Sequence, residues 1–417
     1  MPTRPHAGAR RFARDAGALG LGHAAALAVP LLTLPYLARV LGPGAWGEVA
    51  AALALGNLFA AIPAYGFDGS ATRAVARHRG DEAALRAVVS GTAGARGLLT
   101  VLAAVLFGAC LFVPGVPLRP DALGLAALAY LGAQGVSWGW CFEGLGRFRA
   151  AGALAVLARA PVPLLVVLFV RGPDDAARVP LVYAACSLAE TLAGGWLARS
   201  RAGLDWPRWA WVAVALRDGR TLFAGRAGLT VYLAGNAFWL RLFAGPAAVG
   251  VFSAAEGVAR AVVGALGPVS RALLPRMARA EGADRDRLMR AAFAGALGAG
   301  VALGVLLWAL APLVPRVLGA GFAPAVGLVR MLAPLPLFVA LSQVAGVQGL
   351  LARGRDGAVA VLFGLGGAVN VLSAALLAPR LGAPGMALAL LLAEAAVTAG
   401  ALFLLFRPAR AAPSPPV

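Results

Sequence analysis

The chain has 417 residues, of which 60% are hydrophobic and 13% are charged, and its mean hydropathy of +0.81 excludes the ordinary soluble classes. Its formal net charge of +19 comes from 37 basic residues, all of them arginine. Because these arginines are spread over short gaps between apolar runs, nucleic acid is not an expected partner.

Apolar runs of about 20 residues recur along the chain, and a helix of that length crosses a hydrocarbon core of about 30 Å. The sequence therefore predicts an all-α polytopic membrane protein with about 12 transmembrane helices. Proline, glycine and charged clusters separate the predicted helices, which lie at 15–38, 46–67, 85–112, 121–143, 151–170, 179–198, 219–242, 250–275, 289–314, 324–349, 357–378 and 384–406.

The predicted helices divide into two lobes of six. We expect an N-terminal lobe over 1–200, a linker over 201–218, a C-terminal lobe over 219–406 and a disordered cytoplasmic tail over 407–417. The apolar part of the linker is too short to cross a membrane. Its tryptophans beside Arg208 predict that it lies in the plane of the membrane interface.

The arginines also set the predicted orientation. With the N-terminus inside, about 24 of them fall in cytoplasmic tails and gaps and about 7 in outer gaps, as the positive-inside rule requires. Both termini are therefore predicted to be cytoplasmic. The first cytoplasmic gap carries four of these charges, at Arg73, Arg77, Arg79 and Arg86.

The two halves share a short sequence pattern. The segment GPGAWG at 42–47 and the segment GPAAVG at 245–250 both read G-P-x-x-x-G, 203 positions apart. The segments ARHRG at 76–80 and ARAEG at 278–282 agree at nearly the same offset. These matches favour two lobes in the same orientation, which is the parallel-repeat plan of many transporters.

Several charges fall deep within predicted spans, where each one costs roughly 3 kcal/mol or more unless it faces the protein interior or water. Arg96, Arg226 and Arg260 are the deepest arginines. In the eighth predicted span, polar residues fall within an arc of about 100° on a straight helix. They are Ser253, Glu256, Arg260, Ser270 and Arg271.

Two interpretations of Glu256 and Arg260 remain open at this level. The pair, one helical turn apart, can neutralise itself while joining two helices. Alternatively, Arg260 offers its planar guanidinium to an anionic phosphate, with Glu256 as its counter-ion in the empty state. Arg226, Arg96 and Arg271 are further candidates for binding such an anion.

The chain resembles the bacterial Wzx-type oligosaccharide flippases of the multidrug/oligosaccharidyl-lipid/polysaccharide exporter superfamily. The resemblance is carried by LPYLARVLGPGAWG and YGFDGSATRAVARHRGD in the first half, and by GNAFWLRLFAGPAAVGVFSAAEGVARAVVGALGPVSRALLPRM in the second. Asp68 departs from the pattern, which has an uncharged residue in its place. Near the predicted cytoplasmic mouth its carboxylate would repel a pyrophosphate unless Arg73 neutralises it, and whether these two residues pair is left open.

The resemblance implies two six-helix lobes around a central cavity, in a protein of the bacterial cytoplasmic (inner) membrane. Such a flippase moves a polyprenyl-pyrophosphate-linked oligosaccharide from the inner to the outer leaflet by alternating access. The cargo would serve the biosynthesis of a surface polysaccharide, such as O-antigen or exopolysaccharide, with membrane lipids and a polysaccharide polymerase as further partners. The alternative is a cation-coupled multidrug exporter on the related fold. Deep arginines outnumber deep carboxylates, which favours an anionic cargo.

An enzyme is not expected, because the predicted outer loops are short; the one at 171–178 has only about eight residues. The scattered histidines and the three cysteines, which lack C-x-x-C spacing, predict no metal site. No cofactor is expected, and coupling to protons or to sodium is left open.

Overall fold

A computed structural model describes residues 5–407, with side chains from residue 28 onward except at Asp356 and at parts of two helices in the second half. The described residues are helical almost throughout and include no strand. The helices of the first half are α1 (Pro5–Ala64), α2 (Phe67–Arg77), α3 (Glu82–Cys110), α4 (Ala122–Gly135), α5 (Gly139–Gly144), α6 (Phe148–Leu157), α7 (Val162–Phe169), η1 (Pro173–Asp175) and α8 (Arg178–Ala202).

The second half contains more breaks, including a π-helical segment, η4. Its elements are α9 (Trp209–Ala234), α10 (Asn236–Arg241), α11 (Pro246–Gly264), α12 (Leu266–Arg279), α13 (Gly282–Leu310), η2 (Ala311–Leu313), α14 (Val314–Leu318), η3 (Ala320–Phe322), α15 (Ala325–Met331), α16 (Leu335–Gln343), η4 (Val344–Leu350), η5 (Leu351–Arg353), α17 (Asp356–Leu381) and α18 (Ala383–Phe406).

The prediction of an all-α membrane protein with about 12 transmembrane helices is confirmed. Every predicted span corresponds to helical residues, and nine stretches of the described chain are long and apolar enough to cross a membrane. The first two predicted spans are joined as α1, whose backbone leaves the helical conformation only at Gly42 (φ 69°, ψ 174°). Only glycine adopts this positive φ without strain, so the chain reverses direction there.

Some predicted spans are instead divided into two helices. The eighth is split at Ala265 into α11 and α12, and Pro268 explains the break, because it has no N–H to donate to the carbonyl group of Gly264. The polar arc predicted for this span assumed one straight helix. Ser253, Glu256 and Arg260 lie on α11, whereas Ser270 and Arg271 belong to α12, so the arc is not continuous.

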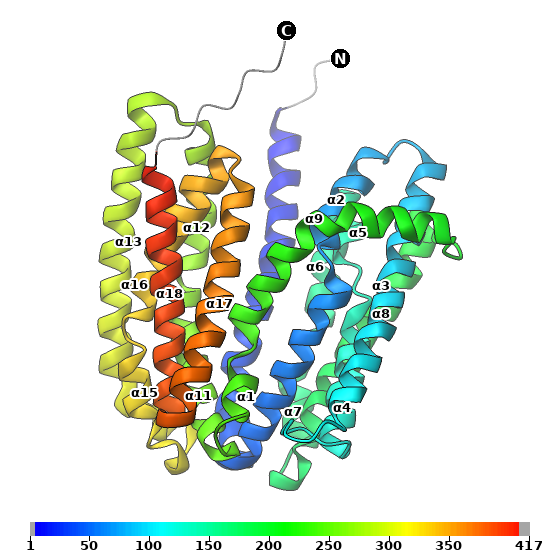
Figure 1. The fold of residues 1–417 in the computed structure, drawn as a ribbon. Helices are drawn as coiled ribbons and strands as arrows, with labels where there is room; N and C mark the ends of the chain where they lie inside the picture. The colour runs from blue at the N-terminus through cyan, green and yellow to red at the C-terminus, as the bar shows by residue number, and fades with distance from the viewer. Residues whose placement is uncertain (1–4, 408–417) are drawn as a thin grey trace.

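The two halves of the chain form two groups of helices that lie side by side, with α1 between them (Figure 1). Helix α1 packs on α3, α4 and α6 of its own half and on α11 of the other. Helix α9 also contacts both groups, since it packs on α3 and on α17. Helix α1 begins and α18 ends at the same end of the molecule, as an even number of spans requires (Figure 1).

The predicted linker runs directly into α9, which is one helix from Trp209 rather than a separate segment that stops at 218. The end of the linker and the first turn of α9 lie against α3 at two glycines. A Cβ atom on Gly91 would be 2.6 Å from the carbonyl oxygen of Trp211, and one on Gly94 would be 2.5 Å from Cβ of Pro207. Trp206 and Trp209 remain exposed, which is typical of side chains at a membrane interface.

The contact between α3 and α9 predicts a difference between two glycines of α3. We expect Gly91→Ala to lower the thermal midpoint of the protein in detergent micelles, because the new methyl group overlaps with the backbone of α9. Gly97→Ala is the matched control, since no heavy atom lies within 4 Å of its added Cβ. It should leave the midpoint unchanged or raise it, because alanine favours a helix by up to about 1 kcal/mol. Equal midpoints for the two variants would contradict the close contact.

Candidate functional site

The turn between α1 and α2 is built from two residues with positive φ, Tyr65 (37°) and Gly66 (77°). The ring of Tyr65 stacks on Phe223 of α9 with centroids 4.7 Å apart. A Cβ atom on Gly66 would lie 2.6 Å from Cβ of Leu222. The turn that opens the YGFDGSATR segment is therefore where α9 crosses the first half of the chain.

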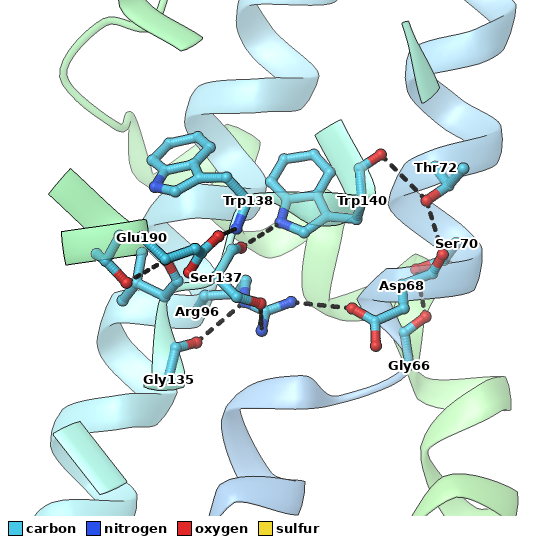
Figure 2. A network of polar contacts seen from close by, with 12 residues as sticks. Gly66, Asp68, Ser70, Thr72, Arg96, Gly135, Ser137, Trp138, Trp140 and Glu190 are labelled. Atoms are coloured by element: carbon cyan, nitrogen blue, oxygen red, sulfur yellow. Dashed lines mark hydrogen bonds and ion pairs between the residues drawn. The ribbon is translucent and has the colours of Figure 1, made fainter. Parts of the chain in front are cut away.

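Arg96 lies at the centre of a polar network directly beyond this turn (Figure 2). Its Nη1 donates to Oδ1 of Asp68 at 3.2 Å, its Nε to the carbonyl oxygen of Gly135 at 3.0 Å, and its Nη2 to Oγ of Ser137 at 3.0 Å. The Arg96 side chain is 4% exposed and that of Asp68 is 39% exposed. A buried guanidinium needs such partners, because water no longer solvates it.

Further hydrogen bonds extend this network to α2 and α8. The backbone N–H of Trp138 donates to Oε1 of Glu190 at 3.1 Å, and Nε1 of Trp140 donates to the carbonyl oxygen of Ser137 at 2.9 Å (Figure 2). The hydroxyl of Thr72 donates to the carbonyl oxygens of Asp68 and Trp140. The network therefore holds α2, α3, α8 and the loop between α4 and α5 together.

Asp68 thus forms its ion pair with Arg96, whereas Arg73 is exposed on the surface of α2. The Arg96 charge compensates the carboxylate that departs from the family pattern. Arg96 as a ligand of the cargo remains a prediction, and in this conformation its guanidinium positions helices.

A second polar group lies on α10 and α11. Oε1 of Glu256 accepts hydrogen bonds from Nε and Nη2 of Arg260 at 2.9 and 2.7 Å and from Nδ2 of Asn236 at 2.7 Å. The side chain of Arg260 is 35% exposed and that of Glu256 is 12% exposed. The predicted pair therefore forms within α11, and Asn236 links it to α10.

The other predicted site residues lie outside the described side chains. Arg226 belongs to α9 and Arg271 to α12, so both remain predictions. Ser270, next to Arg271, is described, and its hydroxyl accepts a hydrogen bond from Nε2 of Gln348 in η4 at 3.1 Å.

The sequence of this chain matches the profile of a protein family and the sequences of curated relatives. The profile of the family described as "Polysaccharide biosynthesis protein" matches residues 12–281, a range that contains both polar groups. The chain belongs to this polysaccharide biosynthesis family. Two relatives are each named "Putative O-antigen transporter". The one from Escherichia coli (strain K12) is 26% identical over 78% of this chain and 79% of its own length, and the one from Shigella dysenteriae is 25% identical over 90% and 95%.

Solved structures share the fold of this family member. A multidrug resistance MATE family transporter of the MOP superfamily, in an inward-facing conformation, aligns with a TM-score of 0.70 at 17% identity, over 91% of this chain and 96% of its own. The lipid II flippase MurJ, in an inward closed conformation, aligns with a TM-score of 0.68 at 13% identity, over 94% and 86%. These similarities place the chain in one fold class with both proteins.

The structure of this family member also shows an ion pair that the sequence analysis missed. Nη2 and Nε of Arg241 on α10 donate to the two carboxylate oxygens of Glu48 on α1, at 2.8 and 3.2 Å. The available signal was positional, because Glu48 directly follows the first G-P-x-x-x-G segment and Arg241 shortly precedes the second. Asn236 and Ser137 gave no comparable signal, since single polar residues are common near helix ends.

The network around Arg96 predicts unequal effects for its two charged partners. Arg96→Leu removes the donor that the Asp68 carboxylate, the Ser137 hydroxyl and the Gly135 carbonyl share. Because the Asp68 side chain is 39% exposed, we expect a cost of about 1.5–3 kcal/mol, below that of a fully buried pair. Asp68→Asn retains an amide oxygen that can accept from Nη1, so its cost should be below about 1.5 kcal/mol. We therefore expect Arg96→Leu to have the lowest thermal midpoint in detergent micelles and Asp68→Asn an intermediate one. Arg73→Leu, which removes an exposed side chain, is the control and should have the highest. An Arg96→Leu midpoint equal to that of the control would show that the network does not stabilise the fold.

Proposed function

We propose that this protein translocates a polyprenyl-pyrophosphate-linked oligosaccharide from the inner to the outer leaflet of the cytoplasmic membrane by alternating access. The family membership and the names of the curated relatives support a transporter of polysaccharide precursors rather than an enzyme. The positive-inside count supports cytoplasmic termini, and the arrangement of α1 and α18 agrees with both termini lying on one side (Figure 1). A polysaccharide polymerase on the outer side would then receive the cargo.

The observation that carries this proposal is the partly exposed Arg260 beside Glu256, whose side chain is 12% exposed. A guanidinium within a transmembrane helix is costly, so its retention calls for an anionic partner. Glu256 supplies that partner through a single oxygen atom. A pyrophosphate can replace it, because its oxygens match the same planar set of N–H donors and carry more charge.

The release of the cargo follows from the same exchange. When the pyrophosphate leaves, Glu256 pairs again with Arg260, and the guanidinium is never left without a counter-ion. Since a ligand shifts a conformational equilibrium only by its difference in affinity between two states, pyrophosphate must bind Arg260 better in the inward-facing state than in the outward-facing one.

Export of a cationic drug is the competing function on the shared fold. A cation would need an acidic side chain that is available to it. Oε1 of Glu256 already accepts three hydrogen bonds, two of them from a guanidinium, and this opposes a cation site at that position. The deep arginines therefore favour the anionic cargo.

Purified protein in proteoliposomes tests the role of Arg260 through the translocation rate of a fluorescent polyprenyl-pyrophosphate oligosaccharide. We expect Arg260→Ala to lower the rate at least about tenfold, which corresponds to about 1.4 kcal/mol in the activation free energy of translocation. Arg260→Lys should retain part of the rate, because it keeps the charge but not the bidentate geometry. Arg290→Ala, which removes an exposed arginine of α13, is the matched control and should leave the rate unchanged. A folded Arg260→Ala protein with the full rate would remove Arg260 from the mechanism.

A deletion strain separates the flippase from a drug exporter. We expect the lipid-linked oligosaccharide to accumulate on the inner leaflet and surface polysaccharide to be lost, while drug resistance stays unchanged. Loss of resistance with a normal surface polysaccharide would contradict the proposed function.

A further inference from the structure

The two G-P-x-x-x-G segments, 203 positions apart in the sequence, are in direct contact in the structure. A Cβ atom on Gly47 would overlap with the carbonyl oxygen of Pro246, and one on Gly250 would overlap with the carbonyl oxygen of Pro43. The same added atoms would lie 2.8 Å from the nitrogen of Gly250 and 3.1 Å from that of Gly47, respectively. The glycine of each segment therefore packs against the proline of the other.

This contact is reciprocal, which is the property of an interface around a twofold axis. The repeated segments of the sequence favour parallel repeats; in that plan a pseudo-twofold axis runs along the membrane normal, and the reciprocal contact places it between α1 and α11. Glycine lets two helix backbones approach within reach of weak Cα–H···O contacts. The G-P-x-x-x-G segment of each half therefore forms the surface at which the two halves are in contact.

Polar and steric contacts surround the glycine pair. Glu48 and Arg241 form a bidentate ion pair whose side chains are 30% and 20% exposed. Nη2 of Arg39 donates to the carbonyl oxygen of Arg316 at 2.8 Å, and a Cβ atom on Gly321 would lie 3.1 Å from the ring of Pro43. All of these contacts join α1 to the second half of the chain.

The contact lies at one end of the molecule only. Helix α1 begins at the end where α18 stops, and α2 returns to that same end, so the reversal at Gly42 between them lies at the opposite end (Figure 1). If the termini are cytoplasmic, the glycine contact closes the outer side.

We infer that Gly47 and Gly250, together with the ion pair of Glu48 and Arg241, form the gate that closes the outer end of the translocation pathway. The inference rests on the proposed function, because it places the release of the cargo at this contact. When the lobes separate here, the reciprocal contact and the ion pair are lost together. Because Cα–H···O contacts and partly exposed ion pairs contribute only about 1 kcal/mol or less each, the gate can open and close during a transport cycle.

A methyl group added at Gly47 or Gly250 should destabilise the closed state of the gate and leave the open state unaffected. The atoms that it would overlap are backbone carbonyls of α1 and α11, which cannot rotate away as a side chain can. The helices must separate to admit it, whereas the open state leaves room for it. None of the four glycines used below has a positive φ, so alanine is compatible with their backbone conformations.

Distances between spin labels test the gate without any cargo. One labelled pair, Leu125→Cys on α4 with Val317→Cys on α14, reports the gated end, and a second, Ala83→Cys with Ala283→Cys, reports the end of the termini; all four residues are exposed. The background replaces the native cysteines Cys110, Cys141 and Cys186. In Gly47→Ala or Gly250→Ala, we expect the first distance to increase by about one helical turn, ~5 Å, and the second to decrease.

Two glycines of the same segments serve as matched controls. No heavy atom lies within 4 Å of a Cβ atom added to Gly44 or Gly245, so Gly44→Ala and Gly245→Ala should keep both distances of the unsubstituted protein. Each variant is first shown to be folded by its thermal midpoint. Folded Gly47→Ala and Gly250→Ala proteins with the distances of the controls would overturn the inference.

The ion pair gives an independent measurement. Glu48→Arg should open the gate through repulsion from Arg241, and the double variant Glu48→Arg/Arg241→Glu should restore the distances of the unsubstituted protein. Failure of the double variant to close the gate would contradict the role of this pair. The spin-label distances measure whether the gate is open, and the proteoliposome assay measures whether the oligosaccharide is translocated. A gate that responds as expected in a protein that moves no oligosaccharide would therefore refute the proposed function and leave the gate intact.

Discussion

Arginine inside a membrane must carry its own counter-charge, and the architecture of this protein follows from how three arginines meet that constraint. Arg96 meets it with partners from several helices, so its network fixes the relative positions of α2, α3, α8 and the loop after α4. Arg260 uses a carboxylate of its own helix, and Asn236 links that carboxylate to α10. Arg241 uses a carboxylate of the other half, so its pair lasts only while the halves are in contact.

The two halves share the G-P-x-x-x-G segments at their contact, but their charged residues lie at different positions. Helices α3 and α13 are both 29 residues long, yet the positions of α13 that lie 202 and 203 residues after Arg96 are Gly298 and Ala299. At the offset of the repeated segments, the residues of α1 that correspond to Glu256 and Arg260 are Leu53 and Asn57. Under the proposed function, the first half thus provides the network of Arg96 and the second the ion pair that pyrophosphate exchanges, so one lobe would hold the charged head group while the lobes move.

The sequence predicted what depends on local spacing. Span length, the reversal near Gly42 and the pairing of Glu256 with Arg260 follow from distances of one helical turn or one membrane thickness. The partners of Asp68 and Arg241 did not follow, because those contacts join residues 28 and 193 positions apart and depend on how helices cross. Pro161, Pro163 and Pro268 indicate bends within predicted spans, and helices do break near them. The breaks in other spans did not follow, since transmembrane helices tolerate proline and glycine and composition alone does not show which of them interrupt the helix.

The reciprocal glycine contact has a consequence for how the two halves diverge. Two copies of a single half, assembled as a symmetric dimer, would form the same kind of interface. In such a dimer any substitution occurs twice, whereas in the joined chain each half changes alone. Residues 43, 47, 246 and 250 remain in reciprocal contact, whereas residues away from this contact can change in one half without a matching change in the other. A single chain can therefore keep a dimer's axis while its two halves take on different charges.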